Sequence, residues 1–238
     1  MIKKVVIAAA GRGTRMLHLT KNKPKHLIEI CNKPFLSYLF DNLLRAGYKE
    51  LILVAGYKKE KMEEFLKKYK YKACLVGQFE ILGKKEYGTA CPLKCVQNLI
   101  KKENFLMING DHIFSVKDLA SFNIDDGYNY ISCVEVQDPE KYGVLKVKNG
   151  FLEKIIEKPK KYIGKLVNNG IYRFTPEVFD KLSDIQPSGR GEYEITEVIN
   201  LLAKERKVKI KKIKDNWVHL TNPIDIITAS NFVKNENS

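Results

Sequence analysis

Short apolar runs alternate with amphipathic segments over residues 5–108 of the chain. The runs typical of buried strands are 5–9, 51–55, 73–76 and 105–108. The segments that repeat apolar residues at helical spacing are 35–47, 59–69 and 88–100. Strands that alternate with helices form βαβ units, whose strands are parallel. This part of the chain is therefore predicted to be α/β, with a mainly parallel central sheet.

The pattern changes after Asp111, where short strands follow one another. The expected strands are 130–136, 144–147, 151–156, 167–174 and 208–213, and the expected helices are 192–203 and 224–232. Asn149 and Gly150 separate two of these strands and favour the two positive φ angles of a tight hairpin. An antiparallel layer is therefore expected beside the parallel sheet. No stretch rich in Pro, Gly or Ser divides the 238 residues, so we expect one continuous domain.

Lysine dominates the charge of the chain. Lys and Arg number 42 against 28 Asp and Glu, and the net charge of +14 suggests nucleic acid, anionic lipid or small anions as partners. Proteins that read nucleic acid rely on arginine forks, whereas lysine pairs on helices and turns are typical of a solvated surface. Small anionic substrates are therefore favoured, and no nucleic-acid partner is expected.

Neither a membrane span nor a signal peptide is recognisable in the sequence. No apolar run approaches the roughly 20 residues that a span needs, and the first four residues lead directly into a strand. We expect a cytoplasmic protein without a membrane partner. The cysteines form no CxxC pair and are expected to be free thiols: Cys31, Cys74, Cys91, Cys95 and Cys133.

A glycine-rich loop, AAAGRGTRM at 8–16, follows the first strand. Gly11 and Gly13 allow the backbone N–H groups to approach phosphate oxygens, and Arg15 adds a charged fork. Lys25 follows Pro24 in an extended segment and can reach the same phosphates. The dinucleotide pattern GxGxxG and the Walker pattern GxxxxGK[ST] are both missing, so the loop predicts a different polyphosphate cradle.

Further motifs follow this loop in a fixed order. They are Gly88-Thr-Ala90, Asn109-Gly-Asp111, Tyr142-Gly-Val144, Glu157-Lys-Pro159, 168–172 (NNGIY), 191–197 (GEYEITE) and 217–225 (WVHLTNPID). Together with the loop, they resemble the sugar-1-phosphate nucleotidylyltransferases, a family that includes glucose-1-phosphate uridylyl- and thymidylyltransferases. The resemblance implies a Rossmann-like three-layer fold with a small antiparallel sugar-binding layer. It places a nucleotide-binding half at 1–115 and a sugar-phosphate-binding half at 116–238, without the family's C-terminal β-helix domain.

The resemblance also implies the reaction and its residues. A nucleoside monophosphate passes from UTP or dTTP to glucose 1-phosphate, and pyrophosphate leaves. The implied catalytic residues are Arg15, Lys25 and Lys158. The implied nucleotide-binding residues are Ala9, Ala10, Gly11, Gly13, Thr14, Arg15, Lys25, Gly83, Gly88, Thr89 and Asp111. The implied sugar-phosphate residues are Gly143, Glu157, Lys158 and Asn168.

Three positions depart from the family pattern, and the mildest departure is His18, where the family often has proline. Gly83 stands where the family commonly has a glutamine that pairs with the base. The identity of the base is therefore not determined by this motif. His219 stands where the family has a second metal-binding aspartate beside Asp111; imidazole suits Mn²⁺ or Co²⁺ better than Mg²⁺. We expect Mg²⁺ as cofactor, with Mn²⁺ or Co²⁺ as alternatives. Also open are another base or sugar, such as GTP with mannose or heptose 1-phosphate, a non-catalytic nucleotide-sugar-binding protein, and a homo-oligomer.

Overall fold

The computed structural model describes residues 2–100 and 102–236. The chain forms two compact units, each built from separate stretches of sequence. We call residues 3–79, 108–123 and 214–238 the loop unit, because they contain the glycine-rich loop. We call residues 1–2, 80–107 and 124–213 the hairpin unit, because they contain the Asn149–Gly150 turn. The proposed division of function near residue 115 remains a prediction.

The loop unit contains a parallel sheet. Its strands β1 (Lys4–Ala9), β4 (Glu50–Ala55) and β5 (Ala73–Gly77) lie in the order β5-β4-β1. Helices α1 (Phe35–Arg45) and α2 (Lys59–Lys68) connect the strands as predicted, and α3 (Gln78–Leu82) follows β5. Val5, Val6 and Ile7 on β1 have no exposed surface, which explains why this strand reads as a continuous apolar run.

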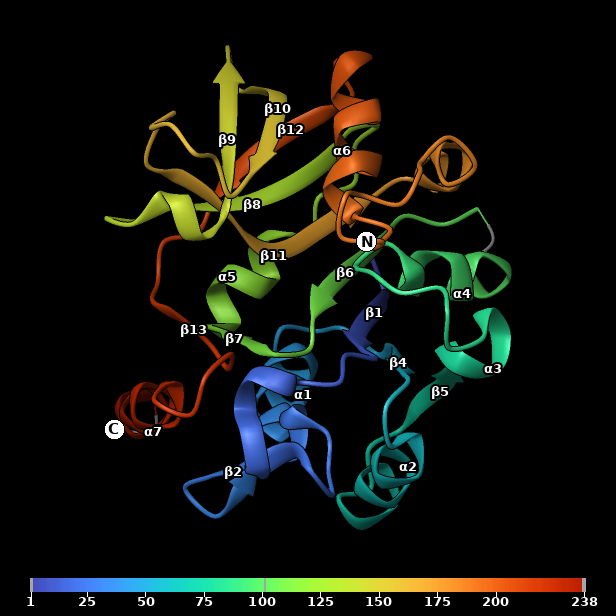
Figure 1. Ribbon diagram of the computed structural model, residues 1–238, viewed down its shortest axis with the longest axis vertical. Helices are drawn as coiled ribbons and strands as arrows, with labels where there is room; N and C mark the ends of the chain where they lie inside the picture. Colours follow the sequence, from blue (N-terminus) through green and yellow to red (C-terminus); the bar gives the residue numbers. More distant parts are fainter. Residues whose placement is uncertain (1, 101, 237–238) are drawn as a thin grey trace. The chain divides into compact units, whose positions relative to one another are not determined.

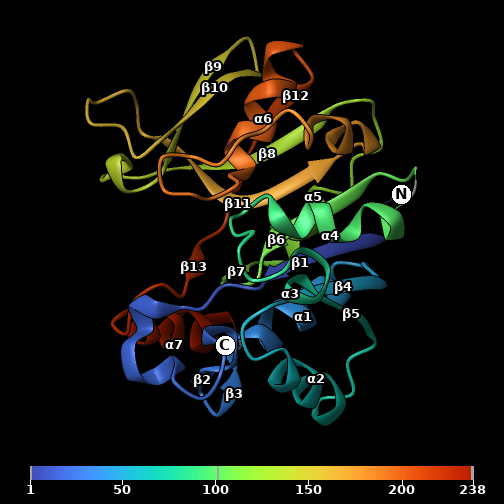
Figure 2. The same ribbon diagram turned by 45° about the vertical axis from the view of Figure 1, so that its right-hand side comes forward.

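Short elements missed by the sequence analysis complete the loop unit. Strands β2 (Glu29–Ile30) and β3 (Lys33–Pro34) form a hairpin, and β7 (His112–Phe114) pairs antiparallel with β13 (Trp217–His219). Helix α5 (Val116–Ser121), also missed, follows β7. Helix α7 (Asp225–Glu236), which was expected at 224–232, lies beside β2 and β3 (Figure 2). These strands have two or three residues, too few for a recognisable apolar period.

The hairpin unit contains a mainly antiparallel sheet. Its strands are β8 (Asn129–Glu135), β9 (Gly143–Lys148), β10 (Phe151–Glu157), β11 (Leu166–Phe174) and β12 (Val208–Lys212), in the order β11-β8-β12-β10-β9. Asn149 and Gly150 have φ angles of 51° and 76°, so the predicted tight turn is confirmed. Strand β6 (Phe105–Asn109) contains the boundary between the two units.

Two helices of the hairpin unit begin later than their apolar spacing suggests. Helix α4 (Cys91–Ile100) starts three residues after Gly88, whose φ of 136° is not helical. Helix α6 (Ile195–Lys204) starts after Glu194, which is extended, and lies along the sheet of this unit (Figure 1). Asn200 fixes α6 to β10, because its side chain bonds both the N–H and the C=O of Ile155, at 2.7 and 3.1 Å. The residues between the expected and the observed start of α4 include the predicted site residues Gly88 and Thr89.

A buried arginine lies in the interior of the hairpin unit, and three of the five predicted thiols, Cys91, Cys95 and Cys133, are buried as well. Arg173 has no exposed side-chain surface, and its guanidinium donates to the backbone carbonyls of Ile124, Asp126 and Tyr128. These charge-assisted bonds compensate for the burial of the guanidinium. All five cysteines are free, as predicted. None of the helices in the described residues is both long and apolar enough to cross a membrane.

Candidate active site

The glycine-rich loop of the loop unit leads from the end of β1 into η1 (Thr14–Thr20), a 3-10 helix. Gly13 adopts φ 64°, and a Cβ at this position would come within 3.0 Å of the Cβ of Lys25. The Gly13 carbonyl accepts hydrogen bonds from the N–H of Met16 at 2.9 Å and the hydroxyl of Thr20 at 3.1 Å. Glycine is therefore required here both for the turn and for the contact with Lys25.

Two predicted side chains of the glycine-rich loop, Thr14 and Arg15, are accessible to solvent. The next residue, Met16, is fully buried. Met16 belongs to a core cluster with Phe35 and Leu220, which anchors the loop within the unit. Arg15 is thus an accessible cation on a fixed backbone, the arrangement that binding of a flexible polyphosphate needs.

Lys25 and Asp111 form an ion pair in the loop unit. The Lys25 ammonium donates to Oδ2 of Asp111, and the two side chains are 12% and 19% exposed. Burial raises the pKa of the Asp111 carboxyl, but Lys25 and His112 outweigh this effect and hold that pKa well below its usual range. The sequence analysis placed both residues at the nucleotide, and the structure brings them into direct contact.

Asp111 is held in place by backbone bonds. The N–H of Gly110 donates to the carbonyl of Ala8 at 2.9 Å, and the carbonyl of Asp111 accepts from the N–H of Leu220 at 2.8 Å. A Cβ on Gly110 would lie 3.0 Å from the oxygen of Ala8. The end of β1, from which the glycine-rich loop starts, and the segment that carries Asp111 are therefore fixed to each other by close backbone approach.

His26 lies near this pair and was missed by the sequence analysis. It is 2% exposed, and burial followed by repulsion from Lys25 lowers its pKa to about 3. Its Cδ2 atom would be 3.3 Å from a Cβ on Gly110, and its Nδ1 has no hydrogen-bond partner among the described residues. A buried, neutral imidazole thus lies close to Gly110 and to the Lys25–Asp111 pair. Its position directly after Lys25 was the signal available in the sequence.

His219 faces His112 across the pairing of β13 with β7. The ring centroids of His112 and His219 are 5.8 Å apart, and Trp217 lies 5.2 Å from the first and 5.0 Å from the second. Nε2 of His112 is 3.6 Å from Oδ1 of Asp111. The described residues contain no group of three or more His, Cys, Asp or Glu arranged to hold a metal ion. The protein side chains alone therefore offer one carboxylate with imidazoles nearby, not a complete metal centre.

The predicted sugar residues come together in the hairpin unit. Gly143 on β9 pairs with Glu157 on β10, and a Cβ on Gly143 would come within 2.9 Å of the Glu157 carboxylate and 3.9 Å of Asn168. Desolvation raises the pKa of the Glu157 carboxyl, while Lys158 lowers it. Gly143 is buried, and the side chains of Glu157 and Asn168 lie close beside it.

Asn168 is oriented by a tyrosine that the sequence analysis did not single out. Its Nδ2 lies 2.7 Å from the hydroxyl of Tyr172, and its Oδ1 accepts the N–H of Gly170 at 3.0 Å. Tyr172 is only 1% exposed. Because both ends of the amide are held, the remaining N–H and lone pair point in defined directions.

Lys158 has an unusual backbone conformation. Its φ of 44° lies in the left-handed region, and its N–H donates to the carbonyl of Tyr142 at 3.0 Å. Such a conformation costs a residue with a side chain on the order of 1 kcal/mol or more and is concentrated at functional sites. The side chain is exposed directly after β10, beside Glu157.

The predicted base-binding loop pairs with the segment before α6, within the hairpin unit. Tyr193 donates its N–H to Tyr87 at 2.8 Å and accepts the N–H of Ala90 at 2.9 Å. A Cβ on Gly88 would come within 2.3 Å of the Tyr193 carbonyl oxygen, so only glycine fits. Gly83 has φ 73° and open space around it, which leaves its backbone accessible.

Glu194 joins the predicted base-binding loop to Arg190, which the sequence analysis missed. Its carboxylate accepts hydrogen bonds from Thr89 at 3.3 Å, Ser188 at 3.2 Å and Arg190 at 2.6 Å. The Arg190 side chain is 49% exposed, and its charge acts on Glu157. The GRGE stretch was the available signal, because it resembles an anion-binding turn.

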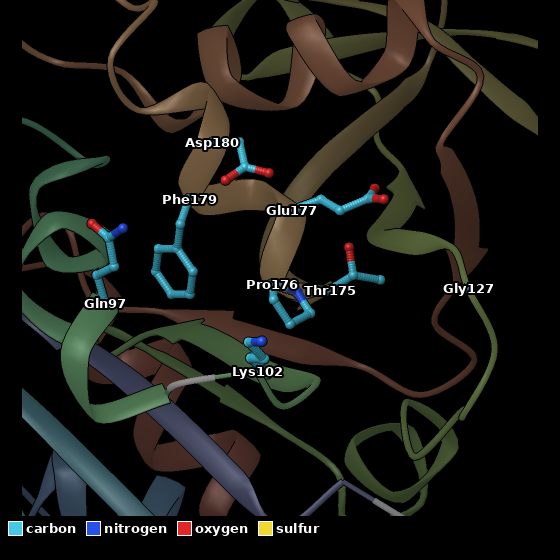
Figure 3. A pocket seen from close by; sticks show the side chains of 8 residues that line it. All are labelled: Gln97, Lys102, Gly127, Thr175, Pro176, Glu177, Phe179 and Asp180. Atoms are coloured by element: carbon cyan, nitrogen blue, oxygen red, sulfur yellow. The ribbon is translucent and has the colours of Figure 1, made fainter.

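A separate pocket of about 580 Å³ lies in the hairpin unit (Figure 3). Its lining residues are Gln97, Lys102, Gly127, Thr175, Pro176, Glu177, Phe179 and Asp180. None of these residues belongs to the predicted site. The carboxylates of Glu177 and Asp180 would repel an anionic substrate, so this pocket is not the candidate active site.

The chain is similar in sequence to known proteins along almost its whole length. Residues 4–236 match the model of the family described as Nucleotidyl transferase. The UTP–glucose-1-phosphate uridylyltransferase AglF of Haloferax volcanii is 35% identical over 221 residues, covering 90% of this chain and 89% of that protein. Mannose-1-phosphate guanyltransferase 2 of Candida glabrata is 32% identical over 235 residues, covering 95% of this chain and 63% of that protein. The chain spans about half the length of other curated relatives that it matches.

A solved structure shows the same fold. A UDP-glucose pyrophosphorylase complexed with UDP-glucose is similar with a TM-score of 0.85 and 26% identity, and the match covers 99% of this chain and 100% of that one. The predicted Rossmann-like α/β fold is therefore confirmed. Together with the family match over residues 4–236, this likeness shows that the chain belongs to the nucleotidyl transferase family.

Proposed function

We propose that the chain transfers a nucleoside monophosphate from UTP or dTTP to a sugar 1-phosphate, with glucose 1-phosphate as the first candidate, and releases pyrophosphate. The observation that carries this proposal is the contact of Lys25 with both Gly13 and Asp111, because it joins a phosphate-binding loop to a cation and a carboxylate. Membership of the nucleotidyl transferase family supports it. Substrates of this kind are found in the cytoplasm, where we place the enzyme.

The reaction needs positive charge and alignment more than it needs a base. A phosphate oxygen of the sugar 1-phosphate attacks the α-phosphorus of the triphosphate in line, and this oxygen is already anionic. The transition state carries negative charge on several oxygens, so its stabilisation depends on cations held in position. We assign Arg15 and Lys25 to the triphosphate and Lys158 to the sugar phosphate. Arg190 adds a second accessible cation in the unit that contains Lys158.

The sugar-binding role rests on hydrogen-bonding groups with fixed directions. Glu157 can accept from sugar hydroxyls, Asn168 can donate one N–H and accept at one lone pair, and the buried Gly143 leaves room for the Glu157 carboxylate beside it. These groups distinguish hydroxyl configurations and do not take part in the phosphoryl transfer. We therefore assign them to selectivity.

The donor set at Asp111 fits a magnesium ion that is shared with the substrate. Mg²⁺ is commonly held by one or two carboxylates together with substrate phosphates, and Asp111 supplies such a carboxylate beside the phosphate loop. When bound, the ion would neutralise charge on the phosphates. His112 and His219 lie near this carboxylate and favour testing Mn²⁺ and Co²⁺ as well.

The identities of the base and of the sugar are the most specific part of the proposal. Gly83 offers an accessible backbone where a glutamine would restrict the base, and the similarity to a mannose-1-phosphate guanyltransferase makes GTP with mannose 1-phosphate the second candidate. Pyrophosphate release should be measured with UTP, dTTP, GTP, CTP and ATP against glucose, mannose and heptose 1-phosphates, in Mg²⁺, Mn²⁺ and Co²⁺. We expect the highest kcat/KM for UTP or dTTP with glucose 1-phosphate. Nucleotide binding without pyrophosphate release in any combination would contradict the proposed transfer.

A further inference from the structure

Lys25 is rigid at its backbone and can move only at the end of its side chain. It begins the 3-10 turn η2 (Lys25–Leu27), in which the N–H of Leu27 donates to Pro24 and that of Ile28 donates to Lys25, both at 3.0 Å. Pro24 and His26 on either side are buried. The Cβ, Cγ and Cδ atoms of Lys25 would lie 3.0, 3.2 and 3.3 Å from a Cβ on Gly13. The turn and the stem are therefore fixed, whereas the ammonium can rotate away from its partner.

That ammonium occupies the carboxylate oxygen that a metal would need. It bonds Oδ2 of Asp111, and Nε2 of His112 lies 3.6 Å from Oδ1. Both side chains of the ion pair are mostly buried, so the charges are poorly screened by water. A divalent cation added to this carboxylate would meet a positive charge at close range. Among the described residues, no group of three His, Cys, Asp or Glu compensates for this repulsion.

We propose that Lys25 serves as the cation of Asp111 in the nucleotide-free protein and competes there with the divalent metal. This inference rests on the proposed function, because the triphosphate resolves the competition. Its oxygens accept the Lys25 ammonium and also complete the coordination of the metal at Asp111. The metal then enters with the nucleotide and not before it.

The exchange keeps the carboxylate neutralised throughout. A mostly buried carboxylate without a cation is strongly unfavourable, and Lys25 prevents this state when no substrate is bound. Because the Lys25 stem touches Gly13, the ammonium has a short path from Asp111 to phosphates held by the loop. One side chain thus fills two roles, and the presence of nucleotide decides which.

Binding of Mn²⁺ to the nucleotide-free protein tests the inference without any turnover. Free Mn²⁺ is measured by electron paramagnetic resonance for the parent, Lys25→Met and the double variant Lys25→Met with Asp111→Asn. Lys21→Met is the matched control, because it also removes one positive charge four residues away but from an exposed side chain. We expect Lys25→Met to bind Mn²⁺ on the order of tenfold more tightly than the parent, because a close like charge is removed from a mostly buried site.

The controls separate competition at Asp111 from general electrostatics. The gain should disappear in the double variant and be small in Lys21→Met. Equal affinities of the parent and Lys25→Met would overturn the inference, as would an equal gain in Lys21→Met or a gain that survives removal of Asp111. Circular dichroism reports whether each variant is folded, and Lys25→Gln, which lacks the charge but retains a hydrogen-bond donor, replaces Lys25→Met if the latter unfolds. Pyrophosphate release by the parent tests the proposed function separately.

Discussion

The two units hold their site residues by different means. In the loop unit, Lys25 and Asp111 form a mostly buried ion pair beside a fully buried neutral imidazole. In the hairpin unit, hydrogen bonds hold the side chain of Asn168. The carboxylate of Glu194 is held there by hydrogen bonds from side chains that are exposed or partly exposed, such as Arg190. Charge at a fixed place suits phosphates, which differ little in shape, whereas oriented hydrogen bonds suit a sugar, whose hydroxyls differ in direction. The comparison predicts that charge changes affect turnover and that orientation changes affect substrate affinity.

The largest effect is expected from glycine replacement in the hairpin unit. A Cβ on Gly88 would lie 2.3 Å from the backbone oxygen of Tyr193, whereas a Cβ on Gly13 would meet the Lys25 side chain at 3.0 Å. Both residues have positive φ, but only Gly88 faces backbone that cannot rotate away. Gly88→Ala should lower the free energy of unfolding by about 4 kcal/mol and Gly13→Ala by about half as much. Urea titrations of the two variants measure this, and a larger loss for Gly13→Ala would reverse the comparison.

Removing a charge from the phosphate loop should mainly lower turnover. Arg15→Ala is expected to reduce kcat on the order of a hundredfold, because in the proposed reaction the guanidinium stabilises developing charge on the triphosphate. Arg15 is exposed, so the melting temperature should not change. Arg12→Ala is the matched control, since Arg12 is also exposed in the same loop but has no assigned role. An equal loss of kcat in the two variants would contradict a specific role of Arg15.

The buried imidazole should make stability depend on pH. His26 has its pKa lowered from 6.5 to about 3 in the fold, so below pH 6.5 the unfolded chain binds a proton that the folded chain does not. Its contribution is complete above pH 6.5 and falls by about 1.4 kcal/mol per pH unit as the pH drops toward 3. His26→Leu should flatten the curve of unfolding free energy against pH in this window, measured in the presence of a chelator. His18→Leu, at an exposed histidine, should retain the slope of the parent; a parental slope in His26→Leu would refute the assignment.

The smallest effect is expected where a neutral contact only orients a side chain. Tyr172→Phe removes the hydroxyl that lies 2.7 Å from Nδ2 of Asn168. A lost hydrogen bond of about 1 kcal/mol corresponds to a roughly fivefold higher KM for the sugar 1-phosphate, with kcat unchanged. Tyr130→Phe is the control, because its hydroxyl bonds Asp126 elsewhere in the same unit. A fall in kcat at unchanged KM would contradict this role, because that is the effect expected of the charged groups in the loop unit.

Much of the fold could be predicted because the responsible signals are local. The apolar run of β1, the amphipathic spacing of α1 and the Asn149–Gly150 turn each depend on a few neighbouring residues. Their physical causes are the side-chain period of each element and the φ angles that asparagine and glycine tolerate. The motif order also identified the family. Helix starts were less certain, since the extended conformation of Glu194 depends on its contacts with Thr89 and Arg190.

The sequence by itself determined the strand and helix pattern, the glycine loop and the residue types that a phosphate-transfer site needs. Only the tertiary structure decided which of those residues touch. Lys25 and Asp111 are 86 positions apart, and His112 faces His219 through a three-residue pairing that no period reveals. The physical reason is that periodicity records which face of one element is buried, whereas ion pairs and ring contacts depend on how separate elements pack. The same packing buries the ion pair and sets its pKa, which no spacing along the chain encodes.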